Sequence, residues 1–224
     1  MIVAIDGPAG AGKSSVAKEA AKRLGYAYID TGALYRTVGL AVQRRGVSTK
    51  DAAAIAACLP GVELDVKYID SVQRVYLAGE DVSQAIRTPE ASLAASDVGK
   101  VPEVRAFLLE LQRELAWAQD SILDGRDIGT VVLPDADVKI YLTASAQIRA
   151  KRRWLQLKAK NIEEPYEKVL AEVIARDEQD MNRAIAPLRP AEDSIELDTS
   201  GIDFEQSVQA VIEIIKENRH EQAL

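Results

Sequence analysis

The stretch from Met1 to Ser15 constrains the fold of this chain more than any other part of its sequence. A short apolar run rich in β-branched residues, Ile2 to Ile5, is followed at once by Gly7-x4-Gly12-Lys13-Ser14, and Ser15 to Leu24 has a helical pattern. A strand, a glycine-rich loop and a helix in this order form the setting in which such a motif binds phosphate. Glycines let backbone N–H groups converge on phosphate oxygens, and the helix N-terminus adds partial positive charge. The sequence therefore predicts that the chain binds a nucleoside triphosphate.

The glycine-rich loop also assigns roles to single residues. Lys13 is expected to reach the β- and γ-phosphates, and the Ser14 hydroxyl to ligate Mg²⁺. Asp124, at the end of a later strand, is a second candidate metal ligand, because Mg²⁺ prefers oxygen donors and keeps several waters. The residues expected to contact the nucleotide are Gly7, Pro8, Ala9, Gly10, Ala11, Gly12, Lys13, Ser14 and Ser15.

Length and composition narrow the class of protein. The chain has 224 residues, enough for one sizeable core with insertions, and a net charge of −7, which argues against a protein devoted to DNA or RNA. No apolar run approaches the roughly eighteen residues of a membrane span, and no secretion signal precedes the first strand. The single cysteine, Cys58, cannot form an internal disulfide. We expect a cytoplasmic protein, a monomer without a membrane or nucleic-acid partner.

Strands and helices alternate along the chain, which predicts an α/β fold with a parallel sheet covered on both faces. Between Val62 and Val82 the pattern changes to strand-like alternation with a turn at Gly79-Glu-Asp, so we expect a small antiparallel sheet inserted there. Trp117 and Trp154 lie at helical apolar spacing and are expected in the core. Helices are expected at 15–24, 30–45, 51–59, 102–119, 148–160, 166–184 and 204–219, and strands at 2–5, 26–29, 62–66, 72–77, 121–124, 138–142 and 194–197.

Two segments place polar residues at expected strand ends, where open α/β sheets bind ligands. Asp30-Thr-Gly-Ala-Leu-Tyr-Arg36 follows the second strand; the alternative is that Asp30 only caps a helix and Arg36 is solvated. Asp124-Gly-Arg126-Asp127-Ile-Gly129 follows a buried strand, and Arg126 could bind a phosphate with two parallel hydrogen bonds. The alternative for this segment is a salt-bridged turn.

Two further groups of charged residues are less specific. Arg176, Asp180 and Arg183 fall at i, i+4 and i+7, which places them on one face of the helix expected at 166–184; taken alone, they fit an ordinary ion-paired surface stripe. Arg152 and Arg153 precede the loop at 161–165, and basic residues beside a mobile loop suit a lid that neutralises a triphosphate and excludes water. The alternative is a solvated helix face.

Two functional classes remain open for a phosphate-binding loop: a small-molecule phosphotransferase and a nucleotide-driven switch. A GTPase would need Asn-Lys-x-Asp, which does not occur in the sequence. The only histidine, His220, falls in a polar tail that we expect to be exposed, so no histidine acid/base chemistry is expected. A second anionic substrate beside the nucleotide is favoured by the arginines at positions 36, 105, 126, 176 and 183.

Together these segments resemble one family closely, the bacterial cytidylate kinases, a branch of the nucleoside monophosphate kinases. The resemblance covers nearly the whole chain, including Gly79-Glu-Asp-Val-Ser83, Ile86-Arg-Thr88 and Asn182-Arg-Ala-Ile-Ala-Pro187 in addition to the segments above. It implies the P-loop NTPase three-layer fold and phosphoryl transfer from ATP, with Mg²⁺, to CMP or dCMP. UMP or another nucleoside monophosphate is the alternative acceptor.

The family's functional residues can be carried over to matching positions. Arg36 and Arg126 resemble the clamp for the acceptor phosphate, and Arg176 and Asp180 the contacts to its sugar. Thr31 stands where many relatives carry serine and keeps the hydroxyl. The residues that resemble the family's cytosine-reading set are Ser96, Arg105, Asp127 and Arg183. The residues expected to act in catalysis are Lys13, Arg36, Arg126, Arg152 and Arg153. The implied organisation is one kinase domain with its core at about 1–36, 119–150 and 166–224, an acceptor-binding insertion at about 37–118 and a lid at about 151–165.

Overall fold

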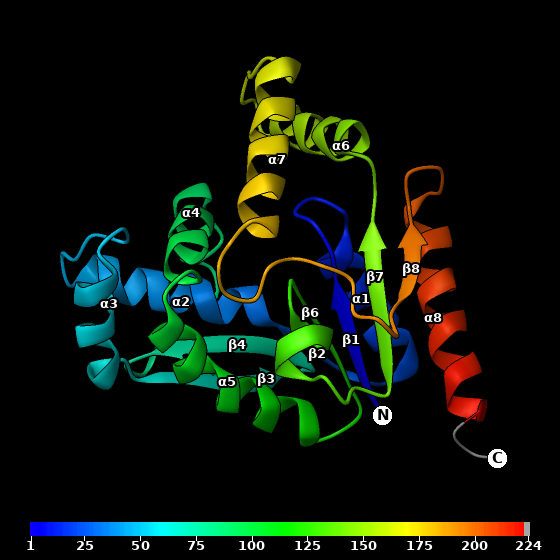
Figure 1. Cartoon of the computed structure of the whole chain (residues 1–224), viewed down its shortest axis with the longest axis horizontal. Coiled ribbons are helices and arrows are strands. Elements are labelled where there is room, and N and C mark those ends of the chain that lie inside the picture. Colours follow the sequence, from blue (N-terminus) through cyan, green and yellow to red (C-terminus); the bar gives the residue numbers. More distant parts are fainter. Residues whose placement is uncertain (222–224) are drawn as a thin grey trace. The chain divides into compact units, whose positions relative to one another are not determined.

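The structure is a computed structural model that describes residues 1–221, with the backbone alone for His220 and Glu221. The expectation for the His220 side chain therefore lies outside the described residues. The chain folds into two compact units (Figure 1). The parallel-sheet unit comprises Met1–Tyr26 and Asp120–Leu224, and the inserted unit comprises Ala27–Gln119. Among the helices of residues 1–221, none combines the length and the hydropathy of a membrane-spanning segment.

The parallel-sheet unit contains four strands in the order β6-β1-β7-β8. They are β1 (Ile2–Asp6), β6 (Ser121–Gly125), β7 (Val138–Thr143) and β8 (Ile195–Asp198). All three pairings are parallel, and the register places Ile5 opposite Asp124 and Asp6 opposite Gly125. The carboxyl ends of β1 and β6 therefore lie at the same edge of the sheet. Asp6 is the last residue of β1, and Asp124 is the last but one of β6. The buried parallel strands expected at 121–124 and 138–142 are confirmed by β6 and β7, whereas β8 is mostly exposed.

Four long helices belong to the parallel-sheet unit: α1 (Lys13–Leu24), α6 (Ala146–Ala159), α7 (Tyr166–Met181) and α8 (Phe204–Glu221). Helix α1 ends where Gly25 adopts a left-handed conformation with φ 73°, which explains why the chain turns there into its next segment. Helices α6 and α7 lie side by side, joined by the loop at 160–165, and α1 packs against α8 (Figure 1).

The inserted unit begins with β2 (Ala27–Asp30) and α2 (Thr31–Arg44) and continues through α3 (Ala52–Cys58) and a 3₁₀ turn at Leu59–Gly61. An antiparallel sheet follows, made of β3 (Leu64–Ile69), β4 (Val72–Leu77) and β5 (Glu80–Asp81) in the order β3-β4-β5, with Leu64 opposite Leu77. Helices α4 (Pro89–Val98) and α5 (Pro102–Trp117) complete the unit. The buried core of the inserted unit is aliphatic. The expected antiparallel insertion is thus confirmed, and the expected insertion at 37–118 falls inside this unit.

Helices α2 and α4 of the inserted unit make a close contact through small residues. A Cβ atom added at Gly39 would lie 2.8 Å from the Ala94 Cβ atom and 3.2 Å from the Ala94 carbonyl carbon. Gly39 is therefore needed for the two helix backbones to approach this closely.

Several elements differ from the sequence expectations. Helix α4 and a π-helical turn at Ile128–Val132 were not expected, and α7 ends at Met181 rather than at 184. The expectation that Trp117 lies in the core is wrong, because it occupies the last turn of α5 and is 61% exposed. Trp154 is half-buried, and its indole N–H donates to the Glu164 carbonyl at 2.9 Å.

Candidate active site

The phosphate loop joins β1 to α1 and depends on its glycines. A Cβ atom added at Gly7, where φ is 147°, would lie 2.0 Å from the Leu142 carbonyl oxygen. Gly12, with φ 96°, occupies the N-cap position of α1, and among the described side chains none caps this helix. The N–H groups of its first turn are therefore not taken by a capping oxygen, which is the arrangement that binds anions at helix N-termini.

Lys13 is the first residue of α1 and is only 4% exposed. Its Nζ atom donates to the Pro8 carbonyl at 2.9 Å, inside the phosphate loop. Burial, together with the Arg126 guanidinium, lowers the pKa of Lys13 to about 7, against the opposing effect of Asp124, Asp6 and Asp180. An anion placed beside Lys13 would favour the charged form of its ammonium group.

Ser14 and Asp124 meet in the parallel-sheet unit. The Ser14 hydroxyl donates to the Asp124 carboxylate at 2.7 Å, and Asp124 is 5% exposed at the end of β6. A hydroxyl and a carboxylate are oxygen donors of the kind that Mg²⁺ prefers. The structure thus brings together the two residues that the sequence proposed as metal ligands.

Asp6, which the sequence reasoning missed, is buried at the end of β1. Its carboxylate accepts the backbone N–H groups of Ile128 and Gly129 at 2.8 and 2.7 Å. Burial raises the pKa of Asp6 to about 6, although these two hydrogen bonds and Lys13 lower it. A charged residue directly before Gly7, at the polar end of an apolar strand, was the available signal in the sequence.

Two arginine–aspartate pairs follow β6. The Arg126 Nε atom donates to Asp180 at 2.9 Å, and the Arg183 Nη2 atom lies 3.4 Å from the Asp127 carboxylate. Asp127 and Asp180 are both buried. The structure therefore pairs Arg126 with Asp180 and Arg183 with Asp127, an arrangement that fits both a polar site and the salt-bridged turn that was its alternative.

The expectation that Arg176, Asp180 and Arg183 share one helical face is wrong for Arg183. Helix α7 ends at Met181, and the Leu188 N–H donates to the Asp180 carbonyl at 2.9 Å, which turns the chain out of the helix. The Arg183 Nε atom then bonds the Ala186 carbonyl. Pro187, which cannot continue a helix, follows this turn. Arg176 remains on α7, one turn before Asp180, and is half-buried.

The arginines of α6 differ in their surroundings. Arg149 is buried and donates to the carbonyls of Ala144 and Ala9 and to the carboxylate of Asp177. Arg152 donates to the Thr199 carbonyl at 2.7 Å and to the Ala11 carbonyl at 3.3 Å. Arg153 is exposed. Arg149 and Arg152 therefore link α6 to carbonyls of the phosphate loop, whereas Arg153 makes no hydrogen bond to this loop within residues 1–221.

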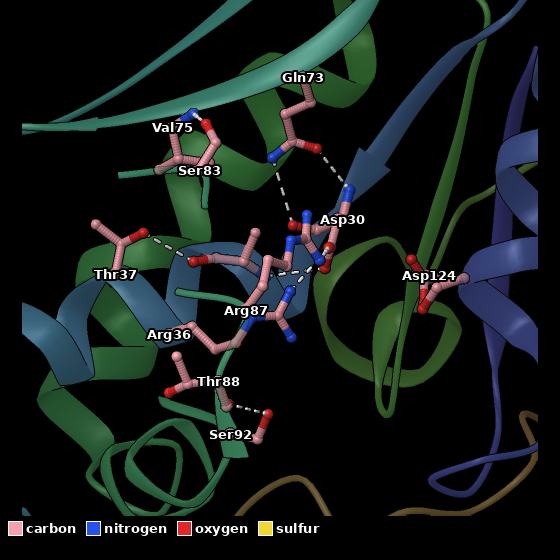
Figure 2. A network of polar contacts seen from close by, with 12 residues as sticks. Asp30, Arg36, Thr37, Gln73, Val75, Ser83, Arg87, Thr88, Ser92 and Asp124 are labelled. Atoms are coloured by element: carbon pink, nitrogen blue, oxygen red, sulfur yellow. Dashed lines mark hydrogen bonds and ion pairs between the residues drawn. The ribbon is translucent and has the colours of Figure 1, made fainter. Parts of the chain in front are cut away.

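In the inserted unit, Asp30 gathers two arginines at the start of α2 (Figure 2). Its Oδ2 atom accepts from Arg36 Nη2 at 2.8 Å and from Arg87 Nη1 at 2.7 Å, while its Oδ1 atom accepts the Ala33 N–H at 2.9 Å. Asp30 thus caps α2, and Arg36 is not merely solvated. Sequence reasoning assigned no role to Arg87, although it lies just before the Thr88-Pro89 helix start.

Three other residues expected at the acceptor, Thr31, Ser96 and Arg105, lie in the same unit. Arg105 donates to the Gly99 carbonyl at 3.3 Å and lies over the Tyr35 ring, 5.7 Å from its centroid. Ser96 is half-buried on α4, and Thr31, the first residue of α2, is buried. The candidate residues thus divide between the units: Thr31, Arg36, Ser96 and Arg105 in the inserted unit, and Arg126, Asp127, Arg176, Asp180 and Arg183 in the parallel-sheet unit.

The sequence matches the model of one protein family over almost its whole length. The model of the family described as cytidylate kinase matches residues 3–217. The chain belongs to the cytidylate kinase family. The resemblance noted from the sequence is thereby confirmed, and so is the expected α/β fold with a parallel sheet and an antiparallel insertion.

Curated relatives are similar over almost their whole length. A cytidylate kinase of Caldicellulosiruptor bescii is 50% identical over 212 residues, covering 95% of this chain and 94% of the relative. That of Carboxydothermus hydrogenoformans is 47% identical, covering 96% and 97%. That of Geobacter sulfurreducens is 46% identical, covering 97% and 93%. This membership in the cytidylate kinase family places the chain among kinases rather than among nucleotide-driven switches.

Proposed function

We propose that this cytidylate kinase family member transfers the γ-phosphoryl group of ATP to CMP or dCMP, producing ADP and CDP or dCDP. The observation that carries the proposal is the family match over residues 3–217, supported by relatives of that name at 46–50% identity. UMP or another nucleoside monophosphate is the alternative acceptor.

The donor would bind at the phosphate loop. Backbone N–H groups at the start of α1 bind the phosphate oxygens, and Lys13, already desolvated, places a positive charge beside the transferring group. Ser14 and Asp124 would hold Mg²⁺, which neutralises charge on the β- and γ-phosphates when it is bound. These residues supply positioning and electrostatic stabilisation, which phosphoryl transfer requires more than covalent catalysis.

The acceptor needs no general base, because the attacking CMP phosphate is already anionic at neutral pH. Arg36 and Arg126 orient this phosphate through their guanidinium groups. Asp127 and Arg183, with Ser96 and Arg105, read the cytosine edge. Arg176 and Asp180 contact the sugar. Arg152 and Arg153 belong to a lid that excludes water, since transfer to water is the competing reaction.

A coupled assay of ATP consumption against CMP, dCMP, UMP, AMP, GMP and shikimate tests the proposal directly. We expect CMP and dCMP to give the highest kcat/KM, because their bases present an amino donor and a ring-nitrogen acceptor to the site. A preference for UMP would support the alternative acceptor. Activity with none of the pyrimidine monophosphates would refute the proposed function.

A further inference from the structure

The buried carboxylate of Asp30 binds the guanidinium groups of Arg36 and Arg87. The expected phosphate clamp includes Arg36 but not Arg87, and capping of α2 by Asp30 requires neither arginine. Arg36 and Arg87 donate to the same oxygen, Oδ2, at 2.8 and 2.7 Å. Asp30 is 5% exposed. Burial alone would raise the pKa of Asp30, but the charges of Arg36 and Arg87 hold it below its ordinary value. Asp30 is therefore ionised at neutral pH and balances one of the two positive charges.

The arginines retain donors that Asp30 does not use. The Arg36 Nε atom is buried and has no hydrogen-bond partner within the described residues. The Arg87 side chain is 52% exposed, and its guanidinium donates a single N–H to Asp30. A guanidinium has five N–H donors, so most of those on Arg87 are available to a ligand. Surplus positive charge and unused donors beside a buried carboxylate are the properties of an anion site.

The inserted antiparallel sheet fixes Asp30 in place. Gln73, on β4, accepts the Asp30 N–H through Oε1 at 2.7 Å, and its Nε2 atom lies 3.4 Å from the Asp30 carbonyl (Figure 2). The Tyr68 hydroxyl, on β3, donates to the Tyr28 carbonyl at 3.3 Å. The two long strands of the insertion thus hold the backbone of β2, from which Asp30 extends towards both arginines.

We propose that Arg87 binds the phosphate of the acceptor nucleotide together with Arg36, and that Gln73 of the inserted sheet is a positioning residue for this pair. The inference rests on the proposed function, because it names a further residue for the same acceptor. It also gives the antiparallel insertion a role: it sets the position of the carboxylate that aligns the two arginines. A structural ion pair is the competing explanation, and it requires no ligand contact from Arg87.

Arg87→Gln separates these explanations. We expect KM for CMP to rise about ten- to hundredfold, as for the loss of a charged hydrogen bond, while KM for ATP and the melting temperature stay close to the wild-type values. Arg44→Gln is the matched control, because Arg44 lies in the same unit, pairs with the exposed Glu80 and loses the same charge. Arg87→Lys should recover only part of the loss, because an ammonium cannot bind phosphate with two parallel hydrogen bonds.

Gln73→Ala tests the positioning role. We expect KM for CMP to rise by less than in Arg87→Gln, and the double variant to show less than the product of the single effects, because both act on one pair. Equal changes in KM for CMP in the Arg87→Gln and Arg44→Gln variants would overturn the proposal. So would a fall in melting temperature without a change in KM.

Calorimetric titration of each variant with CMP, without ATP, keeps this test independent of turnover. If the wild type binds CMP but does not phosphorylate it, the proposed function fails, yet weaker binding by Arg87→Gln still supports the anion site. If the wild type phosphorylates CMP and Arg87→Gln binds it as tightly, the proposed function stands and the role of Arg87 is refuted.

Discussion

The backbone N–H of Gly129 donates a 2.7 Å hydrogen bond to the carboxylate of Asp6. Gly129 belongs to the π-helical turn that follows Asp127, and Asp6 directly precedes the phosphate loop. One carboxylate therefore fixes both the start of the phosphate loop and the turn that directly follows Asp127, an expected base-reading residue. Because the Ile128 N–H bonds the same carboxylate, the turn is held at two successive amides.

Asp6→Asn should weaken this connection. An asparagine amide can accept only one of the two N–H groups and turns a donor towards the other, which costs on the order of 1–3 kcal/mol in unfolding free energy. Chemical denaturation measures the loss, and Asp135→Asn, at an exposed position, is the control. No loss of stability would mean that the turn does not depend on Asp6.

The stability difference between the wild type and the Asp6→Asn variant should also depend on pH. The pKa of Asp6 lies above its ordinary value, at about 6, so this group favours the folded state below pH 3.8 and that contribution is lost as the pH rises through 6. The stability difference between wild type and Asp6→Asn should therefore shrink between pH 4 and pH 7. A difference that does not vary with pH would contradict the burial of an ionisable Asp6.

Lys13→Ala should lower kcat by orders of magnitude at saturating ATP, because a preorganised charge at the transferring group is worth several kcal/mol. Since burial lowers the pKa of Lys13 to about 7, the stability that this residue contributes is present above its unfolded pKa and is lost as the pH falls towards 7. Lys13→Met should accordingly be as stable as the wild type, or more stable, at pH 7 in thermal melts. An unchanged kcat in the Lys13→Ala variant would show that Lys13 takes no part in the mechanism.

Asp124→Asn should increase the Mg²⁺ concentration needed for half-maximal rate by about ten- to hundredfold. The carboxylate that accepts from Ser14 would become an amide, a weaker ligand for a hard cation. Initial rates over a Mg²⁺ titration at fixed ATP give the measurement. An Mg²⁺ dependence identical to the wild type would place Asp124 outside the metal site.

Asp127→Ala should narrow the ratio of kcat/KM values for CMP and UMP. Cytosine presents an amino group to a carboxylate, whereas uracil presents a carbonyl oxygen, and two opposed acceptors cost about 1–3 kcal/mol. Steady-state kinetics with both substrates measures the ratio. If both values fall by the same factor, Asp127 serves the fold or the phosphate, and the base is read elsewhere.

Amide hydrogen exchange should fall at 153–165 when a bisubstrate analogue binds. The protection should change little near Arg149, because that buried side chain already binds the Ala9 carbonyl and Asp177 in the structure. A lid that closes only with its substrates couples charge neutralisation to water exclusion. Equal exchange with and without the analogue would refute the lid assignment.

The sequence predicted the parallel strands and the phosphate loop because apolar runs and glycine spacing are local signals. Helix α4 carried a local signal as well, since Thr88 caps it, Pro89 is its first residue and Glu90 lies in its first turn. Its alanine-rich sequence hid the apolar periodicity. The position of Trp117 could not be read, because spacing alone does not show where α5 runs past the core.

Long-range pairings among the site residues could not be predicted. The π-helical turn is held by Asp6, which is more than a hundred residues away in the sequence. The pairing of Arg87 with Asp30 depends on the path of the chain between β2 and α4. Sequence spacing also placed Arg183 on a helix that ends before it. Residues that act through contacts distant in sequence carry no periodic signature.

The close contact between Gly39 and Ala94 limits how this protein can be stabilised. Replacing a helical glycine by alanine ordinarily gains up to about 1 kcal/mol. At Gly39 the new methyl group would collide with Ala94 and force α4 away from α2. Arg36 lies one turn before Gly39, and Arg87 lies just before the start of α4, so this collision would misalign both arginines. The fold thus keeps a poor helix former where engineering for heat tolerance would remove it first.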